Sequence, residues 1–231
     1  IKAQIPALAA WVEKHDLLSL DPSRPLQVRA TPAYMRGIAG ASISAPGPLD
    51  PQGVTYYNVD PLDGYTPAQA ESFLREYNHW VLQILNIHEA IPGHYLQLLH
   101  SNKSPSKVKA LFGNGAMVEG WAVYAERMMI ESGWGGDDPA MGLMYAKWNL
   151  RVVCNAILDH GVHVLGMQRE AALALLEREA FQSNTEATEK WHRAQVTAVQ
   201  LSSYFAGFSE ILALRDQLKQ AQDERFRLKA F

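Results

Sequence analysis

The dominant pattern along the chain is the recurrence of apolar side chains at the spacing of a helix. Residues 3–16 carry them at steps of three and four, which places them on one helical face. A second helix is expected to begin at Thr66-Pro67, a favourable pair for the N-cap and first helical position, and to continue to residue 88. The same pattern predicts further helices over residues 105–112, 116–132, 139–166, 168–181, 186–200 and 208–227.

Short runs of β-branched and aromatic residues, bounded by Pro, Gly and Asp, occur only near the N-terminus. They predict strands over residues 26–33 and 54–60, with one more short strand around 41–44 in the turn-rich segment between them. We therefore expect a single, mostly α-helical domain with a small antiparallel β-sheet near its N-terminus. In this scheme residues 1–65 form one helix and the sheet, and residues 66–231 form the helical part.

Composition excludes several classes of protein. The chain has 231 residues, of which 48% are hydrophobic and 19% charged, so it can bury a sizeable core. A formal net charge of -3 argues against a nucleic-acid groove, and no apolar stretch is long enough for a membrane span. The one cysteine, Cys154, is expected to be a buried apolar residue. Because the chain begins at Ile1, we expect a processed product or an excised piece, and the compartment stays open.

The segment HEAIPGHYLQ, which begins at His88, carries candidate metal ligands. Neutral imidazole is a standard zinc ligand, and Glu89 could accept a proton from a zinc-activated water. His94 comes six residues after His88, which is about 600° of helical turn, so a regular helix leaves the two roughly 120° apart. Pro92 and Gly93 lie between them and favour a distorted turn that could bring both histidines to one ion.

Glu119, in the segment MVEGWAVYAE, is the candidate for the third ligand. It follows His94 by 25 residues, which is enough for one helix to end and another to return beside it. A carboxylate in such an apolar segment must be paired or ligating, because an unpaired buried charge is costly. Glu126 lies on the same helical face and could accept a hydrogen bond from a ligand histidine. One zinc ion is expected, although another divalent metal could occupy the site. The alternative is a kinked structural helix whose histidines bind no metal.

Four segments together resemble a known bacterial family. They are HEAIPGHYLQ, EGWAVYAE, RVVCNAILDHGVH and QLSSYFAG, and they resemble the proteins grouped as domain of unknown function 885 over roughly residues 50–215. Family members are commonly more than twice as long, so the chain resembles their C-terminal, catalytic part, with the rest of a full-length chain N-terminal to it.

The family is in turn similar to the gluzincins, zinc metallopeptidases with two His ligands and one Glu ligand. The resemblance implies a zincin-like helical domain in which His88, His94 and Glu119 bind the metal and Glu89 is the general base. The implied activity is hydrolysis of peptide bonds. One departure is the pair Ala198-Val199, where the family pattern has Pro-Gly before the segment that contains Tyr204.

Two groups could stabilise negative charge on the carbonyl oxygen during hydrolysis, His163 and Tyr204. Asp159 precedes His163 by four residues, so it could orient the imidazole on a helix. Arg151, Asn155 and Asp159 form a polar stripe at four-residue steps, which is either a buried hydrogen-bond network or one wall of a site. For Tyr204 the alternative is a half-buried aromatic residue next to a small-residue turn.

Two further side chains could contact the substrate or support the ligands. The strand VTYYNVD, which contains Tyr57, is a candidate for the sheet edge that binds an extended peptide, with an ordinary sheet strand as the alternative. Gln97, the last residue of the segment HEAIPGHYLQ, is a second candidate for contact with the substrate or for support of a ligand.

These features together predict a zinc-dependent hydrolase with a peptide substrate. Glu89 would take a proton from the attacking water and pass it to the leaving amine. One alternative is a metal-dependent amidase or esterase that acts on a small molecule. The other is a helical binding module without catalytic activity.

Overall fold

The β-sheet is small and lies near the N-terminus, as predicted, but it is mixed. The computed structural model describes residues 1–21, 24–37, 39–50 and 52–231. Its three strands are β1 (Leu26–Ala30), β2 (Ala41–Ser44) and β3 (Thr55–Val59), in the order β1-β3-β2. β2 pairs with β3 in the antiparallel sense, whereas β1 pairs with β3 in parallel. The prediction of a wholly antiparallel sheet is therefore wrong, because β3 inserts between the two earlier strands.

The central position of β3 also overturns one prediction about the substrate. Tyr57 lies on β3 and is completely buried, and its hydroxyl donates a hydrogen bond to Oδ1 of Asn86 at 2.9 Å. Both edges of β3 are occupied by other strands, so it cannot bind a peptide by edge pairing. The strand at the edge beside the helices is β2.

Helices make up most of the chain, as the apolar periodicity predicts. They are α1 (Gln4–Lys14), α2 (Pro67–Glu76), α3 (His79–Glu89), α4 (His94–Ser101), α5 (Lys107–Leu111), α6 (Gly115–Glu131), α7 (Pro139–Val164), α8 (Arg169–Ala174), α9 (Asn184–Val196) and α10 (Gln200–Gln222). Short turns of 3₁₀ or π helix occur at Ala33–Met35, Leu175–Glu179 and Asp223–Arg225. No described helix combines the length and the apolarity that a membrane crossing requires.

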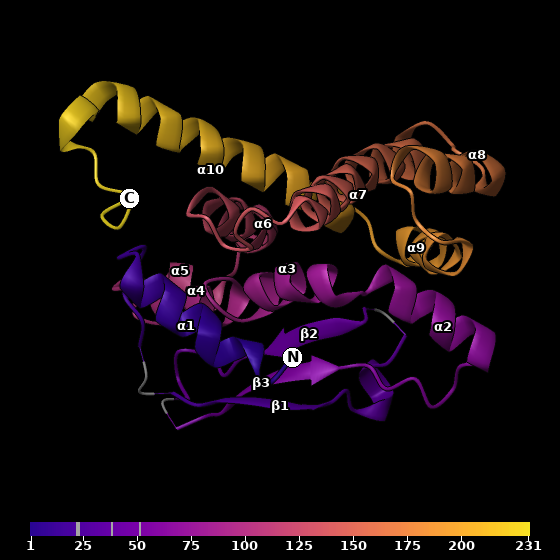
Figure 1. Cartoon of the computed structure of the whole chain (residues 1–231), viewed down its shortest axis with the longest axis horizontal. Coiled ribbons are helices and arrows are strands. Elements are labelled where there is room, and N and C mark those ends of the chain that lie inside the picture. The colour runs from indigo at the N-terminus through magenta and orange to yellow at the C-terminus, as the bar shows by residue number, and fades with distance from the viewer. Residues whose placement is uncertain (22–23, 38, 51) are drawn as a thin grey trace.

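Helix α3 lies between the sheet and a layer formed by α6 and α7, with α10 packed along both of those helices (Figure 1). The predicted helix from Thr66 to residue 88 is divided into α2 and α3. Asn78 causes the division, because its Oδ1 accepts the backbone N–H groups of Trp80 and Val81 and so caps α3. The core runs through this layer, and Cys154 is buried in a second apolar cluster around α7, α8 and α9, as predicted.

Helix α10 begins at Gln200, eight residues before the predicted start. Val199, just before it, has a left-handed backbone with φ +71° and offers no side-chain cap. The cap comes instead from Asp159 on α7, whose Oδ1 accepts the N–H of Val199 at 3.1 Å and whose Oδ2 accepts the N–H of Ser202 at 2.9 Å. A carboxylate at a helix N-terminus also complements the helix dipole. The sequence around residue 200 could not predict this start, because the capping residue lies 40 positions away.

Candidate metal centre

The chain breaks between the two histidines of the motif instead of continuing as one helix. α3 ends at Glu89 and α4 begins at His94, with a cis peptide bond between Ile91 and Pro92. The N–H of Gly93 donates to the carbonyl of Ile87 at 2.9 Å. A Cβ atom on Gly93 would lie only 1.8 Å from the carbonyl oxygen of His88, so this turn requires glycine. The distortion expected at Pro92-Gly93 is therefore present, as a complete break between two helices.

The break turns both imidazoles toward the same carboxylate. Nε2 of His88 lies 3.6 Å from Oε2 of Glu119, and Nε2 of His94 lies 3.3 Å from the same oxygen. Glu119 is on α6, which packs against α3 and α4. Donor atoms of His88, Glu89 and His94 also lie within 4.8 Å of one another, as the ligands of one metal ion would. The structure thus brings the three predicted ligands and Glu89 together.

Glu126 fixes the orientation of the His88 ring. Nδ1 of His88 lies 2.6 Å from Oε1 of Glu126, and Nε1–H of Trp148 donates to the same oxygen at 3.0 Å. A carboxylate accepts, so Nδ1 of His88 carries a proton and Nε2 is left to face Glu119. Burial lowers the pKa of His88, but the hydrogen bonds with Glu119 and Glu126 outweigh burial and raise that pKa to about 10.

The donor set fits a divalent cation. Burial would raise the pKa of Glu119, yet the imidazoles of His88 and His94 hold it well below its usual range. Oε2 of Glu119 faces the two imidazoles, and Oε1 of Glu119 accepts a hydrogen bond from Gln200 at 3.1 Å. Oε2 of Glu89 is buried and has no hydrogen-bond partner. A buried carboxylate that meets two imidazoles suits a zinc ion, which would balance its charge.

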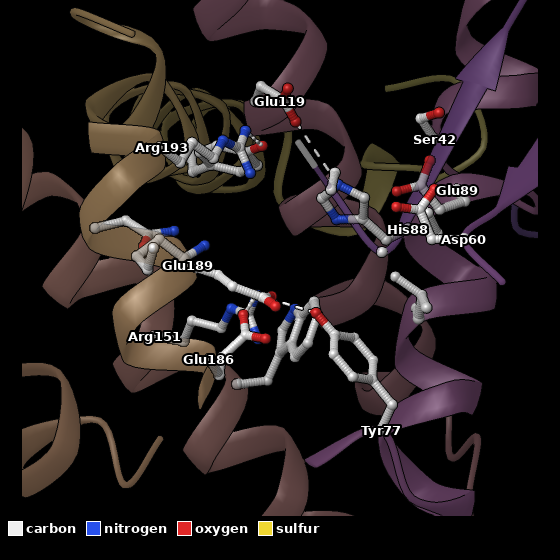
Figure 2. A pocket seen from close by; sticks show the side chains of 18 of the residues that line it. Ser42, Asp60, Tyr77, His88, Glu89, Glu119, Arg151, Glu186, Glu189 and Arg193 are labelled. Atoms are coloured by element: carbon white, nitrogen blue, oxygen red, sulfur yellow. Dashed lines mark hydrogen bonds and ion pairs between the residues drawn. The ribbon is translucent and has the colours of Figure 1, made fainter. Parts of the chain in front are cut away.

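The candidate ligands line a cavity of about 380 Å³ between the sheet and the helices. Figure 2 shows His88 and Glu89 on one wall, with Arg193, Arg151 and Glu186 on the opposite wall. Ala41, Ser42 and Ile43 of β2, an edge strand of the sheet, also line this cavity.

A family comparison matches the whole chain, residues 1–231, to the bacterial proteins of unknown function called DUF885. The chain belongs to the DUF885 family. Among curated proteins, no significant sequence match was found.

Two solved structures are similar to this DUF885 chain. One is described as a "putative lipoprotein of unknown function" from Shewanella oneidensis, with 60% identity and a TM-score of 0.87, and the match covers 100% of this chain and 41% of that one. The other is described as a "putative lipoprotein" from Colwellia psychrerythraea, with 21% identity and a TM-score of 0.82 over 98% of this chain and 38% of that one. The second match shows the fold alone. The chain therefore spans about two fifths of the length of these relatives.

The polar stripe on α7 of the DUF885 chain divides between two tasks. Arg151 and Asn155 line the cavity, where Arg151 forms an ion pair with Glu186 and donates a hydrogen bond to the hydroxyl of Tyr77 at 3.1 Å. Asp159 lies outside it and caps α10. Arg151 and Asn155 therefore belong to one wall of the cavity, whereas Asp159 belongs to a structural hydrogen-bond network.

His163 does not reach the cavity, which corrects its predicted role. Its Nε2 lies 2.9 Å from the carbonyl oxygens of Ala194 and Thr197, and 3.6 Å from Oδ1 of Asp159. It binds the C-terminal end of α9, where carbonyl groups lack helical partners, so a donor is favourable there. It cannot donate to an oxyanion beside His88.

Tyr204 lies on α10 within the cavity, and its ring stacks beside His88 with the ring centroids 6.2 Å apart. The expected small-residue turn next to it is helical, because Gly207 lies inside α10 and packs on Gly120 of α6. Gln97, which was grouped with the site, donates instead to the carbonyl of Met117 at 3.0 Å and joins α4 to α6.

Sequence reasoning missed several cavity residues. Gln200 and Trp148 bind the carboxylates of Glu119 and Glu126. Gln200 begins the segment QLSSYFAG, but no local pattern indicates either contact. Lys190 and Arg193 on α9 were also missed, although their three-residue spacing places them on the same helical face. Only the fold brings this face to the cavity that the candidate ligands line.

Proposed function

We propose that this chain is a zinc-dependent hydrolase that cleaves peptide bonds. The observation that carries the proposal is the approach of Nε2 of His88 and Nε2 of His94 to a single oxygen of Glu119, at 3.6 and 3.3 Å. Such a set leaves one position of a tetrahedral zinc ion open, as catalytic zinc sites do. When bound, the ion would lower the pKa of a coordinated water and polarise the carbonyl group of a substrate.

Glu89 is the residue that moves the proton in this proposal. It follows His88 directly, its side chain is buried, and its Oε2 has no hydrogen-bond partner. A carboxylate oxygen without a partner in a cavity can accept a proton from the attacking water. Glu89 then donates that proton to the leaving amine, which completes general base and general acid catalysis by one group.

Tyr204 supplies a donor for the negative charge that develops on the carbonyl oxygen. Nη2 of Arg193 donates to the phenol oxygen of Tyr204 at 3.0 Å, which leaves the phenol hydrogen free for another acceptor. Burial raises the pKa of Tyr204, and the charge of Glu119 raises it further, so the phenol keeps its proton at neutral pH. A preformed donor of this kind stabilises the transition state more than the ground state.

The free edge of β2 favours a peptide over a small molecule as the substrate. β2 pairs with β3 on one side only, and Ala41, Ser42 and Ile43 line the cavity. An extended peptide can bind by adding to such an edge through backbone hydrogen bonds. β2 therefore takes the role that the sequence predicts for the strand VTYYNVD.

The proposal is tested with the purified chain, loaded with zinc and mixed with unmodified short peptides. We expect cleavage that is removed by a chelator and restored by zinc. Cleavage of simple esters without any cleavage of peptides would instead support the small-molecule alternative. Stoichiometric zinc without turnover of either class would contradict a catalytic role for this chain.

A further inference from the structure

We infer that the cavity contains an anion subsite beside the metal ligands, formed by Lys190 and Arg193, that binds a carboxylate group of the substrate. The inference rests on the proposed function, because it takes the cavity as the place where the substrate binds. It adds the substrate class, which is a peptide that carries a carboxylate next to the bond to be cleaved.

Lys190 is the first observation that points to an anion. Its side chain lines the cavity and is only 5% exposed, yet it forms no hydrogen bond or ion pair with any residue that the structure describes. An ammonium group in such a position is costly unless an opposite charge joins it. Burial lowers the pKa of Lys190 well below its usual value, and the charge of Arg151 lowers it further, whereas Glu186 opposes the change.

Two neighbouring guanidinium groups are also incompletely paired. Arg193 donates from Nη2 to Tyr204, but its Nε is buried and has no partner. Arg151 uses Nη2 for Glu186 and Tyr77, and its Nη1 is buried without a partner. Buried donors without acceptors on one wall of a cavity are what an anionic ligand would satisfy, because charge-assisted hydrogen bonds to a carboxylate are strong.

The acidic side chains on the same wall already have partners of their own. Glu186 is engaged by Arg151, and Glu189 accepts a hydrogen bond from the hydroxyl of Tyr65 at 2.9 Å. In Figure 2, Arg193 lies on the side of Glu119, whereas Asp60 lies on the opposite side of the pocket. Oδ1 of Asp60 is buried without a partner, so a substrate amine is the rival ligand.

A carboxylate in this subsite would lie close to the metal centre. Arg193 binds the hydroxyl of Tyr204, whose ring stacks beside His88, and the charge of Glu119 acts on Lys190. The carboxylate could be the C-terminal group of the peptide or an acidic side chain near the cleaved bond. Both present the same group to Lys190 and Arg193, so peptide design must distinguish them.

Calorimetric titration of the zinc-loaded Glu89→Gln protein, which should bind without cleaving, tests the inference. The probes are N-acetyl-trialanine with a free C-terminus, the same peptide as its C-terminal amide, and an amidated peptide with one central glutamate. We expect the free carboxylate to bind roughly 10- to 100-fold more tightly than the plain amide. If the glutamate peptide also binds tightly, the subsite accepts acidic side chains of the substrate as well as a C-terminal carboxylate.

Variants of this protein then show which residues cause the preference for a carboxylate. Lys190→Met and Arg193→Met should each remove most of it, whereas Lys219→Met, a matched change at an exposed position on α10, should retain it. Equal affinities for carboxylate and amide, or a preference unchanged in both cavity variants, would overturn the subsite. A fourth probe, trialanine amide with a free N-terminus, tests the rival ligand. If it bound more tightly than its acetylated form and no carboxylate preference were seen, the site would bind an amine instead.

Failure of the subsite and failure of the proposed function give different results. If the wild-type protein cleaves peptides but shows no preference for a carboxylate, the subsite is contradicted and the proposed hydrolase function is supported. If the protein cleaves no peptide but binds carboxylates in a way that depends on Lys190, the subsite is supported and the hydrolase function is contradicted.

Discussion

Nδ1 of His88 lies 2.6 Å from Oε1 of Glu126, a side chain that is completely buried. This contact holds the ring so that Nε2 faces Glu119. Glu126→Gln keeps an acceptor but loses the charge that increases the basicity of the imidazole. We expect zinc affinity to fall roughly 10- to 100-fold, as is typical for residues that orient a ligand histidine. Competition with a chromogenic chelator measures this affinity.

The matched control is Glu210→Gln, the same change at an exposed position on α10, which should leave the affinity unaltered. If Glu126→Gln bound zinc as tightly as Glu210→Gln does, Glu126 would not support the metal site.

Substitutions of Glu89 and Glu119 should affect catalysis and metal binding differently. Glu89→Gln should retain zinc and lose nearly all turnover, because a neutral amide cannot accept the proton of the attacking water. Glu119→Gln should lose zinc as well, since a ligand is removed. Zinc content and the rate of peptide cleavage, measured on the same preparations, check both expectations. Undiminished turnover in Glu89→Gln would remove this residue from the mechanism.

The contact between Gly120 and Gly207 holds α6 against α10 and so places Glu119 beside Gln200. A Cβ on Gly120 would lie 2.3 Å from the carbonyl carbon of Gly207, and backbone cannot move aside easily. Gly120→Ala should therefore lower the free energy of unfolding by about 1–3 kcal/mol and weaken zinc binding. Chemical denaturation provides the measurement.

Gly142→Ala is the control for the contact, because a Cβ at this exposed position in α7 meets nothing within 4 Å. It should leave stability unchanged or raise it by up to about 1 kcal/mol, in line with helix propensity. Similar destabilisation in both variants would show that the contact is unimportant.

The sequence was most informative where chemistry and local structure coincide. The clustering of His88, His94 and Glu119 could be predicted because imidazole and carboxylate are typical zinc ligands, and Pro92-Gly93 marks the break in the helix. It was least informative where a long-range contact decides the structure. The start of α10 depends on Asp159, and the orientation of His163 depends on the end of α9. In both cases the partner lies far away in the sequence, so no local pattern around residue 200 or around His163 predicts the contact.

The cap on α10 gives a further prediction. Asp159→Ala removes the acceptor for the N–H groups of Val199 and Ser202 and should lower the free energy of unfolding by about 1–2 kcal/mol. Turnover should also fall, because Tyr204 lies in the first turns of the same helix. His163→Gln, in contrast, should keep turnover within about twofold, because His163 contacts the end of α9 and Asp159 and does not line the cavity.

The central claim is that one divalent ion is held jointly by His88, His94 and Glu119. Anomalous scattering at the zinc edge, from a crystal of the zinc-loaded chain, tests it most directly because it reports the ion and its ligands together. The account predicts one strong peak about 2.0–2.2 Å from Nε2 of each histidine and from Oε2 of Glu119. A peak bound to other side chains, or no peak between these three, would contradict it.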